Sequence, residues 1–327
     1  MIGHVSSKSR ACRHFIEKAG NERKICLLGS PCLKGVLIVL IEKRFCVLNS
    51  EKPGLPLHHL ADHTRAMEVC VDNARSALNA VAGGARRLEL CSSLVEGGLT
   101  PSPGMLKHLK QTLPETCIFV LIRPRGGDFL FDNTELRIMQ EDIRILSQNG
   151  ADGFVFGCLT SDGHVDESAC RVLKAVCEGK PMTFHRAFDM VADPLRTAKT
   201  LIDLGFHRIL SSGQSPSAWE GRLLLRSLVE AVGDEIVVMP GGGISSDNLE
   251  DILVTTRCKE FHASARETVQ SKMLFRNEMC SMGSNSEEFT MKVTSMEKVS
   301  SLVKLFAEVQ QRLDQNMSRN IWNEKDQ

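Results

Sequence analysis

The chain has 327 residues, of which 42% are hydrophobic, and this is enough to bury the core of one large domain or two ordinary ones. Its 40 basic residues balance 40 acidic ones, which excludes a nucleic-acid-binding protein that relies on broad electrostatic attraction. No apolar run approaches the roughly 20 residues that predict a membrane span, and residues 1–30 lack the pattern of a signal peptide. We therefore expect a cytoplasmic protein with no membrane partner.

The 12 cysteines are scattered along the chain, and none forms a CxxC pair. A secreted disulfide scaffold would be shorter, and a zinc module would show tight cysteine or histidine spacing. We interpret them as reduced thiols, most of which pack as small hydrophobic side chains.

Residues 1–65 are basic and show no alternation of strand and helix patterns, so we predict a poorly ordered extension and linker. The segment 52–63 contains two prolines, a glycine and three histidines. His59 and His63 would share a helix face and could bind a metal with His58, but a solvated linker is the favoured interpretation.

From Ala66 onward, short apolar and β-branched runs alternate with segments of helical period. This alternation predicts a parallel sheet, and eight strands predict closure into a (β/α)₈ TIM barrel over residues 66–315. A doubly wound open sheet is the alternative. We expect a last helix over 296–313 and a polar tail over 316–327. The predicted strands are Met67–Val71, Arg87–Cys91, Ile118–Arg123, Gly153–Gly157, Pro181–Arg186, Arg208–Ser212, Ile236–Pro240 and Glu260–Ala265.

Helix starts are predicted by capping side chains that precede the periodic segments. The predicted caps are Asp72, Ser102, Asp166, Asp193 and Ser245.

Function in such barrels collects at the carboxyl ends of the strands, and alternate residues of each strand point inward. On the first strand Glu68 and Cys70 share the inward face, and on the second Glu89 and Cys91 do so. Other polar side chains belong to later strands, and we expect all of them to meet at one barrel mouth. These are Arg123 on the third strand, His185 and Arg186 on the fifth, and Glu260, His262 and Ser264 on the eighth.

Two interpretations of this polar cluster remain open. In the first, Arg123 and Arg186 neutralise Glu68 and Glu89 in a buried ion network with a purely structural role. In the second, an enzyme uses Glu68, Glu89, Arg123 and His185 as catalytic groups for acid/base chemistry on a phosphorylated or anionic small molecule.

A glycine-rich turn follows the seventh strand and indicates an anion-binding site. Glycines let backbone amides approach an anion closely, and barrel enzymes often bind phosphate at this place. A turn needed only for tight packing is the alternative. The predicted anion-binding residues are Gly241, Gly242, Gly243, Ser264 and Arg266.

The sequence resembles the CutC family from about residue 66 to about 310. The motifs that carry the resemblance are MEVC at 67–70, RLELCSSLVEGG at 87–98, IRPRGGDF at 122–129, ADGFVFGCLT at 151–160, TFHRAFD at 183–189, VMPGGGI at 238–244 and EFHASAR at 260–266. The resemblance implies a TIM barrel that is cytoplasmic and also nuclear, forms a homo-oligomer and takes part in copper homeostasis.

The resemblance also implies that Cys70 and Cys91 bind copper(I), since they match the family's proposed cuprous ligands. Cuprous ion is soft and prefers thiolate ligands, and neighbouring strands lie about 4.8 Å apart, so one ion could bridge two like-placed cysteines. Some relatives have cysteine where this chain has Ala263, which by alternation faces outward. A copper-binding protein that buffers or delivers copper is therefore the favoured hypothesis, and the enzyme described above is the alternative.

Overall fold

The computed structural model describes residues 36–41, 44–49, 65–277, 279–280 and 288–325, which belong to two units, 1–63 and 64–327. In the first unit, strand β1 (Val36–Ile41) pairs antiparallel with β2 (Arg44–Asn49). The sequence pattern did not predict this hairpin inside the extension. His58, His59 and His63 lie outside the described residues.

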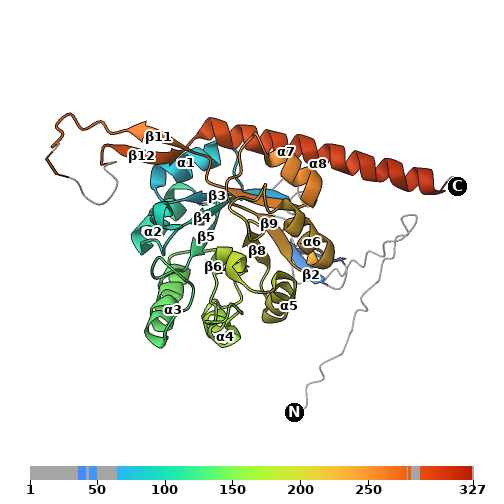
Figure 1. Cartoon of the computed structure of the whole chain (residues 1–327), viewed down its shortest axis with the longest axis horizontal. Helices are drawn as coiled ribbons and strands as arrows, with labels where there is room; N and C mark the ends of the chain where they lie inside the picture. The colour runs from blue at the N-terminus through green and yellow to red at the C-terminus, as the bar shows by residue number, and fades with distance from the viewer. Residues whose placement is uncertain (1–35, 42–43, 50–64, 278, 281–287, 326–327) are drawn as a thin grey trace, which may run out of the picture. The chain divides into compact units, whose positions relative to one another are not determined.

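The described part of the second unit contains the predicted barrel, with its helices arranged around the strands (Figure 1). All eight strands pair in parallel in the order β10-β3-β4-β5-β6-β7-β8-β9. A further parallel bridge between Gly241 and His262 joins the two ends of this order, so the wall is closed. The strands are β3 (Ala66–Val71), β4 (Arg87–Leu90), β5 (Cys117–Leu121), β6 (Gly153–Phe156), β7 (Met182–Phe184), β8 (Arg208–Ser211), β9 (Val237–Pro240) and β10 (Glu260–Ala263).

Side-chain alternation follows the prediction on both sides of the wall. The apolar residues of the first two strands, among them Val69 and Leu88, pack in the large core between strands and helices. Ala263 belongs to the same outer core, as expected. A smaller apolar cluster fills the barrel interior, and its buried members are Cys70, Cys91, Phe119, Leu121 and Val155.

Helices follow the strands around the barrel, and three of them begin where a capping side chain was predicted. Ser102, Asp166 and Asp193 each accept a hydrogen bond from a backbone N–H in the first turn. The helices are α1 (Ala74–Ala82), α2 (Pro103–Thr112), α3 (Asn133–Gln148), α4 (Glu167–Val176), α5 (Pro194–Leu204), α6 (Arg222–Val232) and α7 (Leu249–Thr256).

Two predicted caps were wrong. Helix α1 is capped by Asn73, because the Asp72 carboxylate instead accepts the Leu94 N–H and lies 3.9 Å from Arg266. Helix α7 begins after Asn248, three residues beyond the predicted Ser245.

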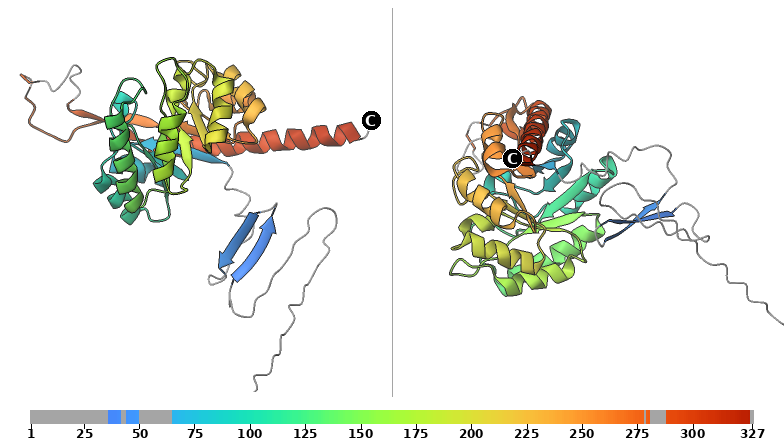
Figure 2. Two further views of the ribbon diagram at one scale, coloured as in Figure 1. Left: turned by 90° about the horizontal axis from the view of Figure 1, so that it is seen from below. Right: turned by 90° about the vertical axis from the view of Figure 1, so that its right-hand side faces the viewer.

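Two elements follow the barrel strands. β11 (Arg266–Gln270) and β12 (Thr290–Thr294) form an antiparallel hairpin that the sequence pattern missed. Helix α8 runs from Met296 to Lys325, so it continues through the segment predicted as a polar tail. The hairpin and the end of α8 extend beyond the barrel in opposite directions (Figures 1 and 2). No helix in the described part of the chain has the length and apolar character needed to cross a membrane.

The loop after β8 depends on two glycines whose backbones lie in contact. A Cβ atom on Gly213 would lie 2.2 Å from the carbonyl oxygen of Gly221, and Gly213 has a φ of +70°. The adjacent Ser212 donates its N–H to Asp189, which pairs with Arg186 near the barrel mouth. This contact therefore helps to position Arg186.

We expect Gly213→Ala to lower the free energy of unfolding by about 3 kcal/mol or more, because a backbone clash adds to the left-handed strain. The matched control is Gly179→Ala, which has a φ of +78° but no atom within 4 Å of its Cβ position. Strain alone costs that control about 1–2 kcal/mol. Urea unfolding measures both, and equal losses would contradict the proposed clash.

Candidate functional site

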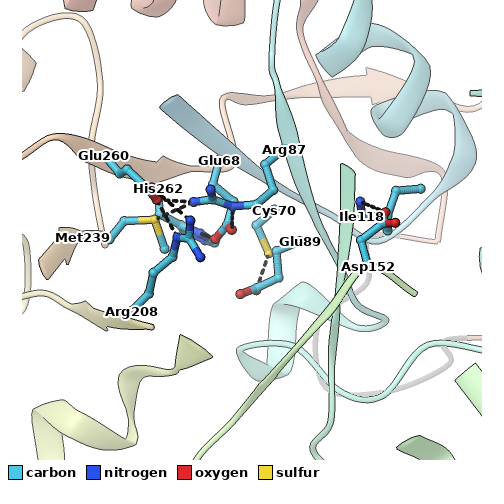
Figure 3. Close-up of polar contacts among 10 residues, drawn as sticks. All are labelled: Glu68, Cys70, Arg87, Glu89, Ile118, Asp152, Arg208, Met239, Glu260 and His262. Atoms are coloured by element: carbon cyan, nitrogen blue, oxygen red, sulfur yellow. Dashed lines mark hydrogen bonds and ion pairs between the residues drawn. The ribbon is translucent and has the colours of Figure 1, made fainter. Parts of the chain in front are cut away.

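The two thiols predicted as metal ligands lie together inside the barrel. Cys70 on β3 is in register with Glu89 on β4, and Cys91 follows the end of β4 on the same inward face. The two Sγ atoms are 3.7 Å apart, and both residues are buried. Cys70 also donates its S–H to Glu89 Oε1 at 3.3 Å (Figure 3). The sulfurs thus share one point in the interior, as the alternation required.

A buried ion network lies beside Cys70 (Figure 3). Arg87 Nε donates to Glu68 Oε2 at 2.5 Å, and its Nη2 contacts Glu260 Oε2. Arg208 Nε donates to the same Glu260 oxygen at 2.8 Å. Both guanidinium groups also lie over the Phe119 ring, at 5.3 and 5.5 Å from its centroid. A buried ion network therefore exists, but its members differ from those predicted.

The arginines predicted to neutralise the glutamates have other partners. Arg123 donates to the carbonyl oxygens of Glu96 and Gly127, at 2.8 and 2.6 Å. Arg186 pairs with Asp189 at 2.7 Å. The prediction failed because it considered only the carboxyl ends of the strands, whereas Arg87 opens β4 in register with Glu68 and Arg208 opens β8.

The two interior glutamates have opposite pKa shifts. Burial would raise the pKa of Glu68, but the charge of Arg87 and the hydrogen bond of His262 outweigh it and lower the pKa to about 2. Burial raises the pKa of Glu89, and the charge of His262 only partly opposes this. Glu89 Oε2 is buried and has no hydrogen-bond partner among the described residues. Glu89 is thus the interior carboxyl group that lacks compensation.

His262 joins the thiols and was not predicted as a metal ligand. Its Nδ1 lies 2.8 Å from Glu68 Oε1, which leaves Nε2 for another partner. Donor atoms of Cys70, Glu89 and His262 all lie within 4.8 Å of one another, a spacing that could hold a metal ion. A histidine whose second ring nitrogen is held by a carboxylate is a common metal-ligand arrangement. The sequence contained a signal for this role. Alternation places His262 on the inward face of the eighth strand, and that strand pairs with the first strand, which carries Cys70.

A cavity of about 280 Å³ opens above these groups at the barrel mouth. Most of the residues predicted for catalysis or anion binding line it, whereas Glu68, Cys91 and Gly241 do not. Glu260 instead pairs with Arg87 and Arg208 in the interior, whereas Arg186 and His262, which were expected at the mouth without an assigned catalytic or ligand-binding role, also line the cavity. Its polar lining comprises Cys70, Glu89, Arg123, His185, Arg186, Gly242, Gly243, His262, Ser264 and Arg266.

His185 is a neutral hydrogen-bond donor in this lining. Burial and the nearby charge of Arg123 lower its pKa from 6.5 to about 3. Its Nδ1 accepts the Ala187 N–H at 3.2 Å, so Nε2 carries the proton. Nε2 is buried and has no partner among the described residues. The imidazole therefore presents one unused N–H group.

Comparison with known proteins identifies the family. The CutC family model matches residues 65–267, which include all eight barrel strands. This chain belongs to the CutC family. The match confirms the resemblance that the sequence motifs indicated, and it leaves residues 1–64 outside.

Individual relatives agree with this assignment. The human copper homeostasis protein cutC homolog is 52% identical over 238 residues, which cover 72% of this CutC-family chain and 87% of the human one. The Drosophila melanogaster protein of the same name is 46% identical over 215 residues, 65% of this chain and 81% of its own. The crystal structure of the putative copper homeostasis protein CutC from Streptococcus agalactiae has 36% identity and a TM-score of 0.59, and the match covers 61% of this chain and 98% of that chain.

Removal of the central arginine tests the ion network. We expect Arg87→Met to lower the free energy of unfolding by about 3–5 kcal/mol, because it leaves Glu68 buried with less compensation. Arg226→Met is the control, since Arg226 forms an exposed pair with Glu230 on α6 and should contribute less than about 1 kcal/mol. Chemical denaturation measures both variants. Similar losses of unfolding free energy in the two variants would show that the buried network stabilises the fold no more than an exposed ion pair does.

The depressed pKa of His185 predicts a loss of stability in acid. Between pH 6.5 and 3, the His185 imidazole is protonated in the unfolded chain but stays neutral in the folded one. The contribution of His185 to the free energy of unfolding is therefore fully present above pH 6.5 and is lost as the pH falls toward 3. His185→Asn keeps an acceptor for the Ala187 N–H but does not titrate. We expect the stability deficit of this variant relative to the natural protein to shrink by roughly 2 kcal/mol between pH 7 and 4.5. A deficit that stays constant over this range in urea unfolding would contradict the assignment.

Proposed function

We propose that this CutC-family protein binds cuprous ion between Cys70 and Cys91 and thereby buffers or delivers intracellular copper. The observation that carries the proposal is the 3.7 Å separation of the two Sγ atoms. With metal–sulfur bonds of about 2.3 Å, as in zinc thiolates, one ion can touch two sulfurs up to roughly 4.6 Å apart. The names of the human and Drosophila relatives, which are copper homeostasis proteins, support the same role.

The surroundings of the thiols favour a soft cation. Cuprous ion accepts two or three ligands and prefers sulfur, with imidazole as a further suitable donor. His262 offers that third ligand, because Glu68 already holds its Nδ1. The uncompensated Glu89 carboxyl group adds negative potential beside the sulfurs when it is ionised. A cation at this point would lower the cost of burying an ionised Glu89.

Binding must displace protons from the thiols. The hydrogen bond with Cys91, burial and the nearby Glu89 together raise the pKa of Cys70 well above its usual value. The metal-free protein therefore keeps this sulfur protonated, and the thiolate forms as the metal binds. Because a reduced thiol pair is required, we place the protein in the cytoplasm and the nucleus, where thiols stay reduced. A homo-oligomer remains a prediction from the family resemblance.

Competition with a chromophoric cuprous chelator under anaerobic conditions tests the proposal. We expect Cys70→Ser and Cys91→Ser each to weaken cuprous binding by about 100-fold or more, because a hydroxyl group is a poor ligand for a soft ion. His262→Asn should weaken it by about 10-fold or more.

The matched control is Cys177→Ser. Cys177 is buried outside the mouth, and its Sγ donates to the Leu173 carbonyl oxygen, a bond that serine can also make. This variant should keep the natural stoichiometry and affinity. Full cuprous stoichiometry in the folded Cys70→Ser/Cys91→Ser double variant would overturn the proposal.

A further inference from the structure

The barrel mouth carries a second set of groups that copper binding does not use. Three arginines line the cavity, Arg123, Arg186 and Arg266, against one carboxyl group, that of Glu89. Guanidinium groups attract anions and can form paired hydrogen bonds with phosphate. The rim of the cavity is therefore suited to an anion, whereas its floor at Cys70 is suited to a soft cation.

The glycine turn after β9 supplies an unused backbone donor at this rim. The Gly242 carbonyl accepts the Ala218 N–H at 2.9 Å, and the Gly243 carbonyl accepts the Asn248 side-chain amide at 2.8 Å. Among the described residues, the Gly243 N–H makes no hydrogen bond, whereas the Gly242 N–H points to the His262 carbonyl across the parallel bridge that joins Gly241 to His262. Gly243 has a φ of +69°, so its N–H is held without a side chain over it. A free backbone amide in a glycine turn is a typical part of an anion cradle.

Gly241, also predicted as an anion-binding residue, is part of the barrel wall instead. Its N–H donates to the Ser211 carbonyl at 2.9 Å, and it bridges to His262. A Cβ atom at this position would lie 2.5 Å from Leu210 Cδ1. We therefore leave Gly241 out of the anion site.

Arg186 is held against the cradle by its own partners. Its Nε donates to Asp189 and its Nη2 to Ser212 Oγ, at 2.7 and 2.8 Å. Its third nitrogen, Nη1, would lie 3.5 Å from a Cβ on Gly242. Arg266 lines the cavity from the start of β11, 3.9 Å from the partly buried Asp72. Both guanidinium groups are thus oriented by a carboxylate and keep N–H groups for a ligand.

We infer that this cavity binds the phosphate group of a small organic molecule through the Gly243 amide, Ser264, Arg186 and Arg266. The convergent donors exceed what a single carboxylate can use, and they match a phosphate with three terminal oxygens. The cavity continues past this cradle to Glu89 and His185, so it has room for an organic part that carries polar groups. The unpartnered Nε2 of His185 and Nε of Arg123 are buried donors in the same lining.

Phosphate binding to the metal-free, reduced protein tests this inference. Inorganic phosphate and glycerol phosphate serve as probes, followed by ³¹P line broadening and by the shift in melting temperature against chloride at equal ionic strength. We expect both probes to bind, with glycerol phosphate the tighter. Arg266→Gln and Arg186→Gln should each weaken binding by about 10-fold or more. Arg226→Gln, which removes an exposed arginine from α6, should leave it unchanged.

Two cross-controls separate this site from the copper site. The Cys70→Ser/Cys91→Ser double variant should keep phosphate binding, and Arg266→Gln should keep cuprous stoichiometry. Folded Arg266→Gln and Arg186→Gln variants that both respond to phosphate like the natural protein would overturn the inference. Equal affinity for the two probes would overturn the claim that the cavity accepts an organic part.

Discussion

The Arg87 guanidinium is the constraint on which the barrel interior depends. It lies between Glu68 and Glu260, and Arg208 completes the group, so two carboxylates and two arginines compensate one another away from water. Without Arg87, two strands would each present a carboxylate to an interior that cannot solvate it. Because Arg87 keeps Glu68 ionised, Glu68 can in turn hold Nδ1 of His262. The orientation of a candidate metal ligand thus depends on an ion pair formed by the first residue of β4.

The neutrality of this network leaves Glu89 as the interior acid without a matched cation. The carboxyl group is buried, and the one hydrogen bond that the described residues provide comes from the Cys70 thiol. The sulfurs themselves pack with Phe119, Leu121 and Val155. This apolar packing excludes water, and burial raises the pKa of both the Cys70 thiol and the Glu89 carboxyl group. A site of this kind favours a cation that binds sulfur strongly, because only strong metal–sulfur bonds offset the free energy needed to ionise the thiols.

The sequence was most informative where one periodicity controls many residues. Strand alternation placed Cys70, Cys91 and Glu89 inside the wall, and the alternation of strands with helices identified the closed barrel. It was least informative where partners are set by three-dimensional register: the pairing of Arg87 with Glu68 spans 19 residues and that with Glu260 spans 173. The role of His262 was missed for the same reason, since it depends on contact between the first and last strands. The β1–β2 and β11–β12 hairpins were missed because they lie outside the strand–helix repeat of the barrel.

The two proposed ligand sites share one cavity, and this has a thermodynamic consequence. Cys70 and Glu89 line its floor, whereas Arg186 and Arg266 line its rim. A cuprous ion that replaces two thiol protons changes the charge of the floor from zero to −1, and an anion adds negative charge at the rim. Like charges in a low-dielectric cavity repel, and coupling between two sites is reciprocal. The factor by which the anion weakens copper binding must equal the factor by which copper weakens anion binding, so a phosphorylated molecule at the rim would favour release of the metal.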